Sequence, residues 1–348
     1  MRHVARLLSA VPVVLTLLPF VKTGRWWVRI WDYPRQQLAV ALALTVPLQM
    51  VGLPRGRPRR LSLVATLAAL AWQLLEIRPY TRTARVQALP ATRRDAPRTL
   101  SILMANVRQG NRRIDRFLAQ VDARDPDIVL TLETDGWWDQ GLTALAARYP
   151  YVVRHPLANT YGLHLFSKLE LHDVTVQDRV TRGVPSVFAR VRLRSGEMVR
   201  IYGVHPEPPQ VSNDVHDRDA ELLLIAREVA DDAADVIVFG DLNDVAWSHT
   251  TRLFQRISGL LDPRVGRGLY PTFHAGVPLA RWPLDHVFHG AAFRLEHLDV
   301  LDAFGSDHFP VYVRLVFDPA AVRAHEIPTP DRGDEQEARE KIADGLGR

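Results

Sequence analysis

The chain has 348 residues, of which 47% are hydrophobic, enough for one large domain with its own core and an accessory segment. It contains no cysteine, which excludes disulfides, thiolate metal sites and cysteine nucleophiles. Any metal would need carboxylate, amide or imidazole ligands, which favours hard ions such as Mg²⁺ or Mn²⁺.

The net charge of +5 combines two parts of opposite sign. Residues 1–98 contain 16 Lys and Arg against 3 Asp and Glu, whereas the remaining residues contain 28 against 36. Because the larger part is acidic, its composition disfavours nucleic-acid binding through a broad basic surface.

Residues 1–77 contain three apolar runs, at 4–20, 38–53 and 61–77, each near the minimum length needed to cross a bilayer. Arginines flank the runs, and Trp26, Trp27 and Trp31 lie between the first two, as interfacial anchors would. We expect a multi-pass membrane anchor of about three transmembrane helices, with the lipid bilayer as partner. The alternative is a signal peptide followed by soluble helices. Lys and Arg counts, 10 against 6, favour a cytoplasmic location for the domain that follows, but the four arginines of loop 54–60 favour the reverse, so the side stays open.

Residues 78–98 lack apolar periodicity and are expected to form a linker, followed by the main folded domain at 99–317. Short β-rich runs predict strands at 100–105, 127–132, 161–166, 187–193, 199–204, 236–239, 284–288 and 311–317. Helices are expected at 112–121, 137–148 and 215–230. Several strands are joined too tightly for crossovers, which favours a mixed sheet or a two-sheet sandwich with outer helices. The polar, proline-containing segment 318–348 predicts a disordered tail.

Polar residues fall where these strands end or begin. Rigid strands can bring such groups together at one rim of a sandwich. The residues are Asn106, Glu133, His205, Asp241, Asn243, Asp285, Asp307 and His308.

These residue types suit phosphoester hydrolysis. Carboxylate and amide groups can hold a hard cation that neutralises charge on phosphoryl oxygens, and another carboxylate can deprotonate water. A cationic imidazole, oriented by a second carboxylate, can stabilise the transition state. Singly, each has a plainer reading: Asn106 as a turn residue, Asp241 and Asn243 as helix caps, and His205 as the start of a proline-rich loop. Asp285 within an apolar run is harder to explain without a partner such as His308.

The sequence resembles the endonuclease/exonuclease/phosphatase superfamily, the deoxyribonuclease-like metal phosphoesterases, as a membrane-anchored bacterial-type member. The resemblance rests on seven segments in order: ILMAN at 102–106, DIVLTLE at 127–133, GLHLFS at 162–167, GVH at 203–205, VIVFGDLN at 236–243, LDHVF at 284–288 and GSDHFP at 305–310. It implies a four-layer αββα sandwich, an α/β fold, preceded by the transmembrane helices.

The resemblance also implies roles for the matching residues. Glu133 would be the principal metal ligand, with Asn106 and Asp307 close to the ion. Asp241 would orient or deprotonate water, and Asn243 would hold the phosphate. His308, oriented by Asp285, would contact phosphoryl oxygens, with His205 as a second imidazole. His164 departs from the small or apolar residue usual in its strand.

A second cluster contains Arg264 and Arg267, between the Asp241 and Asp285 motifs. We expect these arginines to bind a substrate phosphate or carboxylate, or else to belong to a solvated loop with turn glycines. 

The leading prediction is a membrane-anchored, divalent-metal-dependent hydrolase of a phosphodiester or phosphomonoester. Tethering to a bilayer and the acidic soluble part favour a lipid-linked or small phosphoester over nucleic acid. One alternative is a nuclease acting on DNA or RNA, and another is a catalytically silent, membrane-tethered binding module. The oligomeric state is left open.

Overall fold

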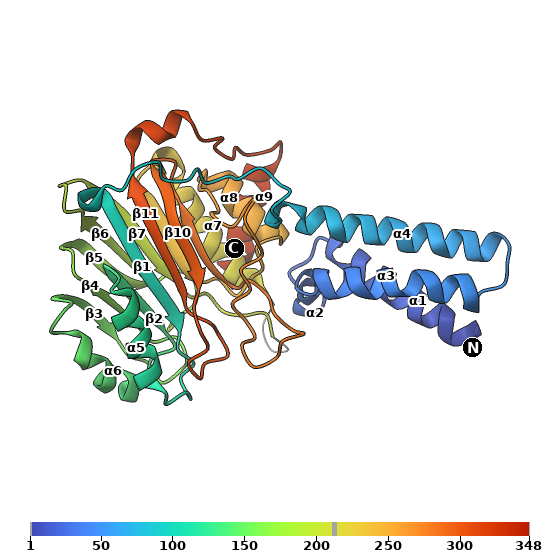
Figure 1. Ribbon diagram of the computed structural model, residues 1–348, viewed down its shortest axis with the longest axis horizontal. Helices are drawn as coiled ribbons and strands as arrows, with labels where there is room; N and C mark the ends of the chain where they lie inside the picture. Colours follow the sequence, from blue (N-terminus) through green and yellow to red (C-terminus); the bar gives the residue numbers. More distant parts are fainter. Residues whose placement is uncertain (1, 211–213, 348) are drawn as a thin grey trace.

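The computed structural model describes residues 2–210 and 214–347 and consists of two parts (Figure 1). A bundle of three long helices projects from one side of a larger body built on two β-sheets. The bundle comes from the start of the chain, and the body from the segments that follow.

The described residues form two mixed sheets. The first has the order β10-β11-β1-β2-β4-β3 and the second β5-β6-β7-β8-β9. The β1–β2 and β7–β8 pairs are parallel, and the other pairs are antiparallel. The first sheet contains β1 (Thr99–Asn106), β2 (Ile128–Leu132), β3 (Tyr151–His155), β4 (Leu163–Ser167), β10 (Phe293–Val300) and β11 (Val311–Phe317). The second contains β5 (Leu171–Asp178), β6 (Pro185–Arg192), β7 (Met198–Val204), β8 (Val236–Asp241) and β9 (Asp285–His289).

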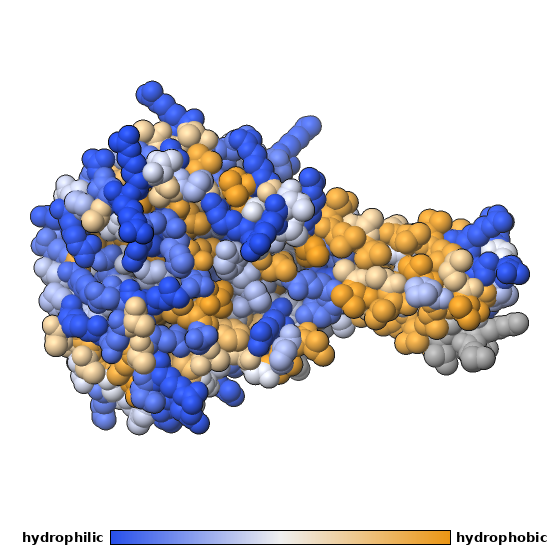
Figure 2. All heavy atoms as spheres, in the orientation of Figure 1, coloured by the Kyte–Doolittle hydropathy of each residue, from blue (hydrophilic) through white to orange (hydrophobic). Residues whose placement is uncertain are grey.

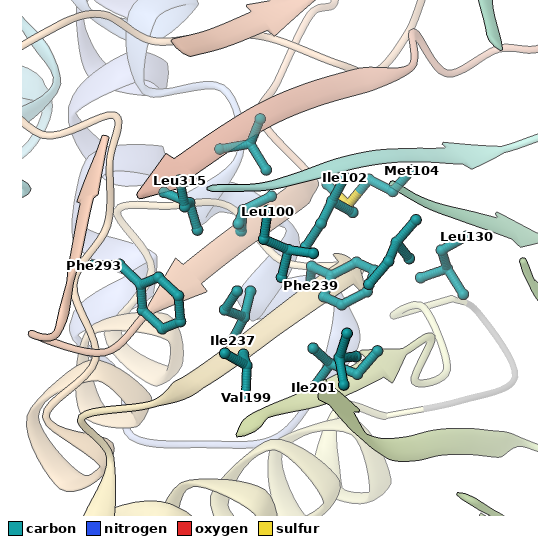
Figure 3. Packing of buried hydrophobic residues seen from close by; sticks show 14 of the residues in the cluster. Leu100, Ile102, Met104, Leu130, Val199, Ile201, Ile237, Phe239, Phe293 and Leu315 are labelled. Carbon is teal, nitrogen blue, oxygen red and sulfur yellow. The ribbon is translucent and has the colours of Figure 1, made fainter. Parts of the chain in front are cut away.

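Successive side chains of the central strands point alternately into two hydrophobic cores, one between the sheets and one under the outer helices. In β1, Leu100, Ile102 and Met104 face the second sheet, whereas Leu103 and Ala105 pack under the outer helices. Figure 3 shows the inter-sheet core. Because both faces are buried, these strands appear in the sequence as nearly continuous apolar runs, and each of the eight predicted strands is present.

Helices cover the outer face of each sheet. Helices α5 (Ile114–Arg124) and α6 (Gly136–Leu142) pack on the first sheet, and α7 (His216–Val229) and α8 (His249–Ser258) on the second. The layer order is therefore helix, sheet, sheet, helix, which confirms the predicted αββα sandwich.

The segment after the last strand differs from the expected disordered tail. Residues 318–347 include η7 (Pro319–Arg323) and helix α9 (Asp334–Gly345). Ala338 and Ile342 of α9 are buried against α7, and the Lys341 ammonium lies 2.7 Å from the Asp219 carboxylate. Few apolar residues are enough to dock this polar helix, because they lie four apart on one face.

Residues 78–98, expected to be a linker, run along the sandwich. After α4 they form η3 (Arg78–Tyr80), and later η4 (Ala96–Arg98). Ala88 is buried in the inter-sheet core, and Pro90 bridges to Leu295 of β10. This segment therefore packs as part of the body.

The bundle consists of α1 (Arg2–Leu17), α3 (Arg35–Gly52) and α4 (Arg57–Ile77). Its interior contains polar pairs: Gln49 donates to Thr66 at 2.6 Å, and Gln73 to Thr16 at 3.0 Å. Large apolar side chains point outward instead, and Figure 2 shows the resulting hydrophobic surface with a hydrophilic far tip.

Among the described residues, one helix is long and apolar enough to cross a membrane, at 57–80 with a mean hydropathy of 1.4. The apolar helix at 6–20 is shorter. Length and composition thus support one of the three expected spans.

Candidate active site

The predicted site residues meet at one rim of the sandwich. Asn106 ends β1 and Glu133 follows β2 in the first sheet, while His205 follows β7 and Asp241 ends β8 in the second. Each pair of strands is parallel, so their carboxyl ends lie at the same edge. Both sheets therefore contribute polar groups to one place.

An amide joins the two sheets at the centre of this rim. Asn106 Nδ2 donates to Glu133 Oε1 at 2.8 Å and to Asp241 Oδ2 at 3.1 Å. The Gln109 backbone N–H donates to Glu133 Oε2 at 3.3 Å. Burial raises the pKa of the Glu133 carboxyl despite these hydrogen bonds. Burial therefore disfavours the Glu133 anion, and a bound cation would favour it.

Two imidazoles face Asp241. His308 Nδ1 lies 2.8 Å from Asp285 Oδ2, while its Nε2 lies 3.5 Å from Asp241 Oδ2. His205 Nε2 lies 3.8 Å from the same Asp241 oxygen. Burial lowers the pKa of both rings, but the charges of Asp285 and Asp241 outweigh it at His308 and raise its pKa to about 10. The site thus pairs a cationic imidazole with one whose pKa is depressed.

The loop after β8 holds Asn243 in an unusual conformation. Its φ is 50°, in the left-handed region, and Glu133 is similar at 61°. The Asn243 backbone N–H donates to Asp241 Oδ1 at 2.9 Å, and its side-chain Nδ2 donates to the Pro206 carbonyl at 2.9 Å. Left-handed backbone at non-glycine residues is strained and concentrates at functional sites.

Asp307 lies beside this group at a more open position. Its side chain is 23% exposed, and its carboxylate lies 3.7 Å from Arg108 Nε. The neighbouring Ser306 hydroxyl donates to the Asn106 carbonyl at 2.8 Å, which ties the segment before β11 to the end of β1. The negative charge of Asp307 contributes to raising the pKa of Glu133, as expected for neighbouring carboxylates.

The structure gives Arg264 and Arg267 internal partners, in contrast to the expected substrate-binding role. Arg264 is buried, its guanidinium pairs with Asp262 at 2.8 Å, and it lies 2.6 Å from His286 Nδ1. Arg267 donates to the carbonyls of Pro263 and Ala88. Both guanidinium groups therefore have partners within the protein, and Arg264 Nη1 also lies 3.5 Å from the Asp285 carbonyl oxygen.

His164 belongs to a separate network. Its Nδ1 lies 2.8 Å from the Thr134 hydroxyl, and its Nε2 lies 2.7 Å from Asp139, which also accepts from Arg154. These contacts explain a histidine in this strand as a local structural feature.

Sequence reasoning missed several neighbours of the site. The Thr272 hydroxyl accepts from the Asp285 N–H at 3.1 Å, and the Phe273 ring lies 4.9 Å from the His308 ring. The Tyr161 ring lies 5.3 Å from that of His205. Phe273 could be noticed in the sequence as an aromatic residue shortly before Asp285. Its contact with His308 could not, because the two residues are far apart in the sequence.

Oxygen and nitrogen ligands for a metal are available at the rim. Asp241, Asp285 and His308 place ligand atoms within 4.8 Å of one another. However, the Asp285–His308 hydrogen bond already accounts for that contact. Next to Asp241, Glu133 and Asn106 add carboxylate and amide oxygen atoms, a set that suits hard divalent ions.

A two-sheet sandwich with this carboxylate, amide and imidazole rim defines the class of metal-dependent phosphoric ester hydrolases. The model of the Endonuclease/Exonuclease/phosphatase family matches residues 102–308, more than half of the chain. The chain therefore belongs to this family, whose enzymes use divalent metals. No curated protein matches the sequence.

Solved structures share the fold at low sequence identity. The catalytic domain of human Nocturnin with a bound sulfate anion is 17% identical with a TM-score of 0.53, covering 69% of this chain and 100% of that one. D. rerio TDP2 complexed with single strand DNA product is 17% identical (TM-score 0.51; 62% and 98%). The endonuclease/exonuclease/phosphatase of Beutenbergia cavernae is 18% identical (TM-score 0.51; 64% and 72%).

Proposed function

We propose that this chain is a membrane-anchored phosphoesterase that uses Mg²⁺ or Mn²⁺ to hydrolyse a phosphoester carried by a membrane lipid. The observation that carries this proposal is a loop, residues 273–282, that joins the catalytic rim to the base of the bundle. Catalysis is assigned to residues 99–317.

Glu133, Asn106 and Asp307 would hold the metal. The donor chemistry supports this set, because all three offer oxygen atoms and the pKa of Glu133 is raised by burial. When bound, the ion would neutralise negative charge on the phosphoryl oxygens.

The remaining groups have complementary roles. Asp241 is within reach of both imidazoles and of the Asn243 N–H, so it can orient water and take its proton. His308, held by Asp285, presents a positive charge toward the phosphoryl group. Asn243 would bind a phosphoryl oxygen, and His205 would assist as the second imidazole.

Insertion of the bundle in a bilayer is supported by its distribution of polarity. Its polar side chains face inward and bond one another, whereas Leu44, Val51 and Val64 are exposed, Val51 at 90%. In water this arrangement would be costly, but in hydrocarbon it satisfies the polar groups and solvates the apolar ones. Figure 2 shows the apolar band beside the polar body.

A lipid-linked substrate is supported by the 273–282 loop. Its Phe273 packs on His308, while Leu279 at its tip is 86% exposed and Val277 is 44% exposed. Gln37 of α3 donates to the Leu279 carbonyl at 2.9 Å, so the apolar tip lies beside the bundle. A lipid headgroup could reach the rim while its chains remain beside these apolar side chains.

The nuclease alternative is supported by the shared fold with D. rerio TDP2, whose structure is complexed with single strand DNA product. The acidic composition of residues 99–348 disfavours it. The silent-module alternative is disfavoured by the intact hydrogen-bonded rim.

The test uses the full-length protein in detergent micelles or vesicles. Phospholipid, its water-soluble headgroup phosphodiester and single-stranded DNA are assayed in parallel with Mg²⁺, Mn²⁺ or EDTA, with Glu133→Gln as the inactive control. We expect metal-dependent hydrolysis that is fastest on the lipid. Faster cleavage of DNA, weakening with added salt, would establish the nuclease reading, and no metal-dependent turnover on any phosphoester would leave the silent module.

A further inference from the structure

Two tyrosines from the N-terminal part reach the loop that follows β8. Tyr33, directly after η2 (Ile30–Asp32), donates its hydroxyl to the Asn243 carbonyl at 2.5 Å. Tyr80, at the end of η3, donates to the Ala246 carbonyl at 2.5 Å. Both tyrosines are buried, so these bonds are shielded from water.

A third contact runs in the opposite direction. Trp247, at the end of the same loop, donates its indole N–H to the Asp32 carbonyl at 2.7 Å. Its ring packs against that of Tyr80, with centroids 5.9 Å apart, and Tyr33 packs against Trp282 at 5.9 Å. The base of the bundle and the 242–247 loop thus form one buried cluster, separate from the cores of the sandwich.

The Tyr33 bond acts on the strained residue of the site. The Asn243 carbonyl accepts two hydrogen bonds, from Tyr33 and from Arg218 Nη1 at 2.8 Å. Fixing this carbonyl fixes the left-handed backbone of Asn243, and with it the N–H that bonds Asp241 and the side-chain amide. Without two donors the residue could relax toward an unstrained conformation.

We infer that Tyr33 is a positioning residue of the active site, so the N-terminal anchor completes the catalytic centre in addition to attaching it. Tyr33 lies outside the family-matched residues 102–308, so this support comes from a segment outside the family-matched domain. The inference rests on the proposed hydrolysis for its kinetic readout, but on neither a lipid substrate nor membrane insertion.

Tyr80→Phe provides a matched control for Tyr33→Phe. Each substitution removes one hydroxyl from a buried tyrosine that donates to a carbonyl of the same loop. Of these two tyrosines, only Tyr33 bonds Asn243, the residue whose N–H contacts Asp241. Arg218 is unsuitable, because it also pairs with Asp219 at 2.8 Å and its loss would leave buried charge.

The experiment compares the full-length wild type and both variants in detergent with Mg²⁺ and a soluble phosphodiester. We expect Tyr33→Phe to lower kcat roughly tenfold with KM little changed, since a positioned group is displaced and not removed. Tyr80→Phe should keep kcat within about twofold. Both variants should lower Tm by a similar amount, because each loses one neutral hydrogen bond. Equal losses of kcat in the two variants, or full kcat in Tyr33→Phe, would overturn the inference.

Hydrogen–deuterium exchange of peptides covering 240–247 provides a readout that does not require activity. We expect Tyr33→Phe to accelerate exchange at the Asn243 amide, and Tyr80→Phe to leave that amide protected. If the wild type hydrolyses no phosphoester, the proposed function fails, whereas the positioning inference is decided by this exchange pattern. Unchanged protection of Asn243 in Tyr33→Phe would reject it.

Discussion

In the three-helix bundle, Gln49, Thr66 and Gln73 lie inside and bond to one another or to Thr16, while leucines and valines face outward. In the sandwich the arrangement is reversed, with apolar cores between and outside the sheets. This difference in polarity is what the proposed insertion of the bundle in a bilayer requires, with the sandwich in water. The catalytic rim and the 273–282 loop lie near their junction, where the proposed lipid phosphoester would be presented.

The largest effect is expected at the rim of the sandwich. Glu133→Gln should lower kcat by roughly 10³-fold, because the amide removes the negative charge proposed to hold the metal. EDTA should abolish the wild-type rate in the same assay. Circular dichroism is expected to show an unchanged fold, and a near-normal rate in the variant would reject Glu133 as a metal ligand.

His308→Ala should lower kcat by about 10²-fold, because it removes a cationic group aimed at the phosphoryl oxygens. The matched control is His164→Ala, another buried strand-side imidazole, whose bonds to Thr134 and Asp139 lie outside the rim. That variant should retain most of the activity while losing stability in thermal unfolding. Comparable kinetic losses would place His164 in the site.

Burial decided which strands could be predicted from the sequence. Strands buried on both faces, such as β1 and β8, were predictable from their apolar runs. The missed strands β3, β5 and β10 all lie at sheet edges, where one face is exposed and charged residues interrupt the pattern. Helix α9 was missed because two buried apolar residues dock it.

The site shows a similar division. Motifs at strand ends predicted the convergence of Asn106, Glu133, Asp241 and His308, because strand geometry fixes where such residues lie. The partners of Arg264 were not predictable: it forms an ion pair with Asp262 and donates a hydrogen bond to His286. Side-chain partners that form only on folding leave no local pattern in the sequence.

The polarity contrast predicts that the same substitution will act differently in the two regions. Leu44→Arg, on the outer face of α3, should weaken membrane retention by about 2.5 kcal/mol, the insertion cost of a central arginine. Val174→Arg, on the exposed face of β5, is the control and should not change it. Retention is measured as resistance to salt and carbonate extraction. Full retention of Leu44→Arg would argue against a lipid-facing α3.

The two regions should also respond differently to acid, because the bundle pairs above are uncharged. In the sandwich, burial lowers the pKa of His289 to about 4 from 6.5. The unfolded chain therefore binds the proton first, so stability is complete above pH 6.5 and falls as the pH drops toward 4. This group alone should cost about 2 kcal/mol at pH 5. Denaturant unfolding of His289→Gln should show a shallower pH dependence, and an identical slope would contradict the assignment.

The smallest expected effect concerns the junction itself. Leu279→Ser removes the most exposed apolar side chain of the 273–282 loop without touching His308. If this tip contacts lipid, hydrolysis of a vesicle-bound phospholipid should fall by about tenfold, since burial of one leucine contributes about 1.5 kcal/mol. The rate on the soluble headgroup phosphodiester should stay unchanged, because the rim is intact. Equal losses on both substrates would mean that the loop supports the fold of the rim, and the lipid would then have to approach the site by another side.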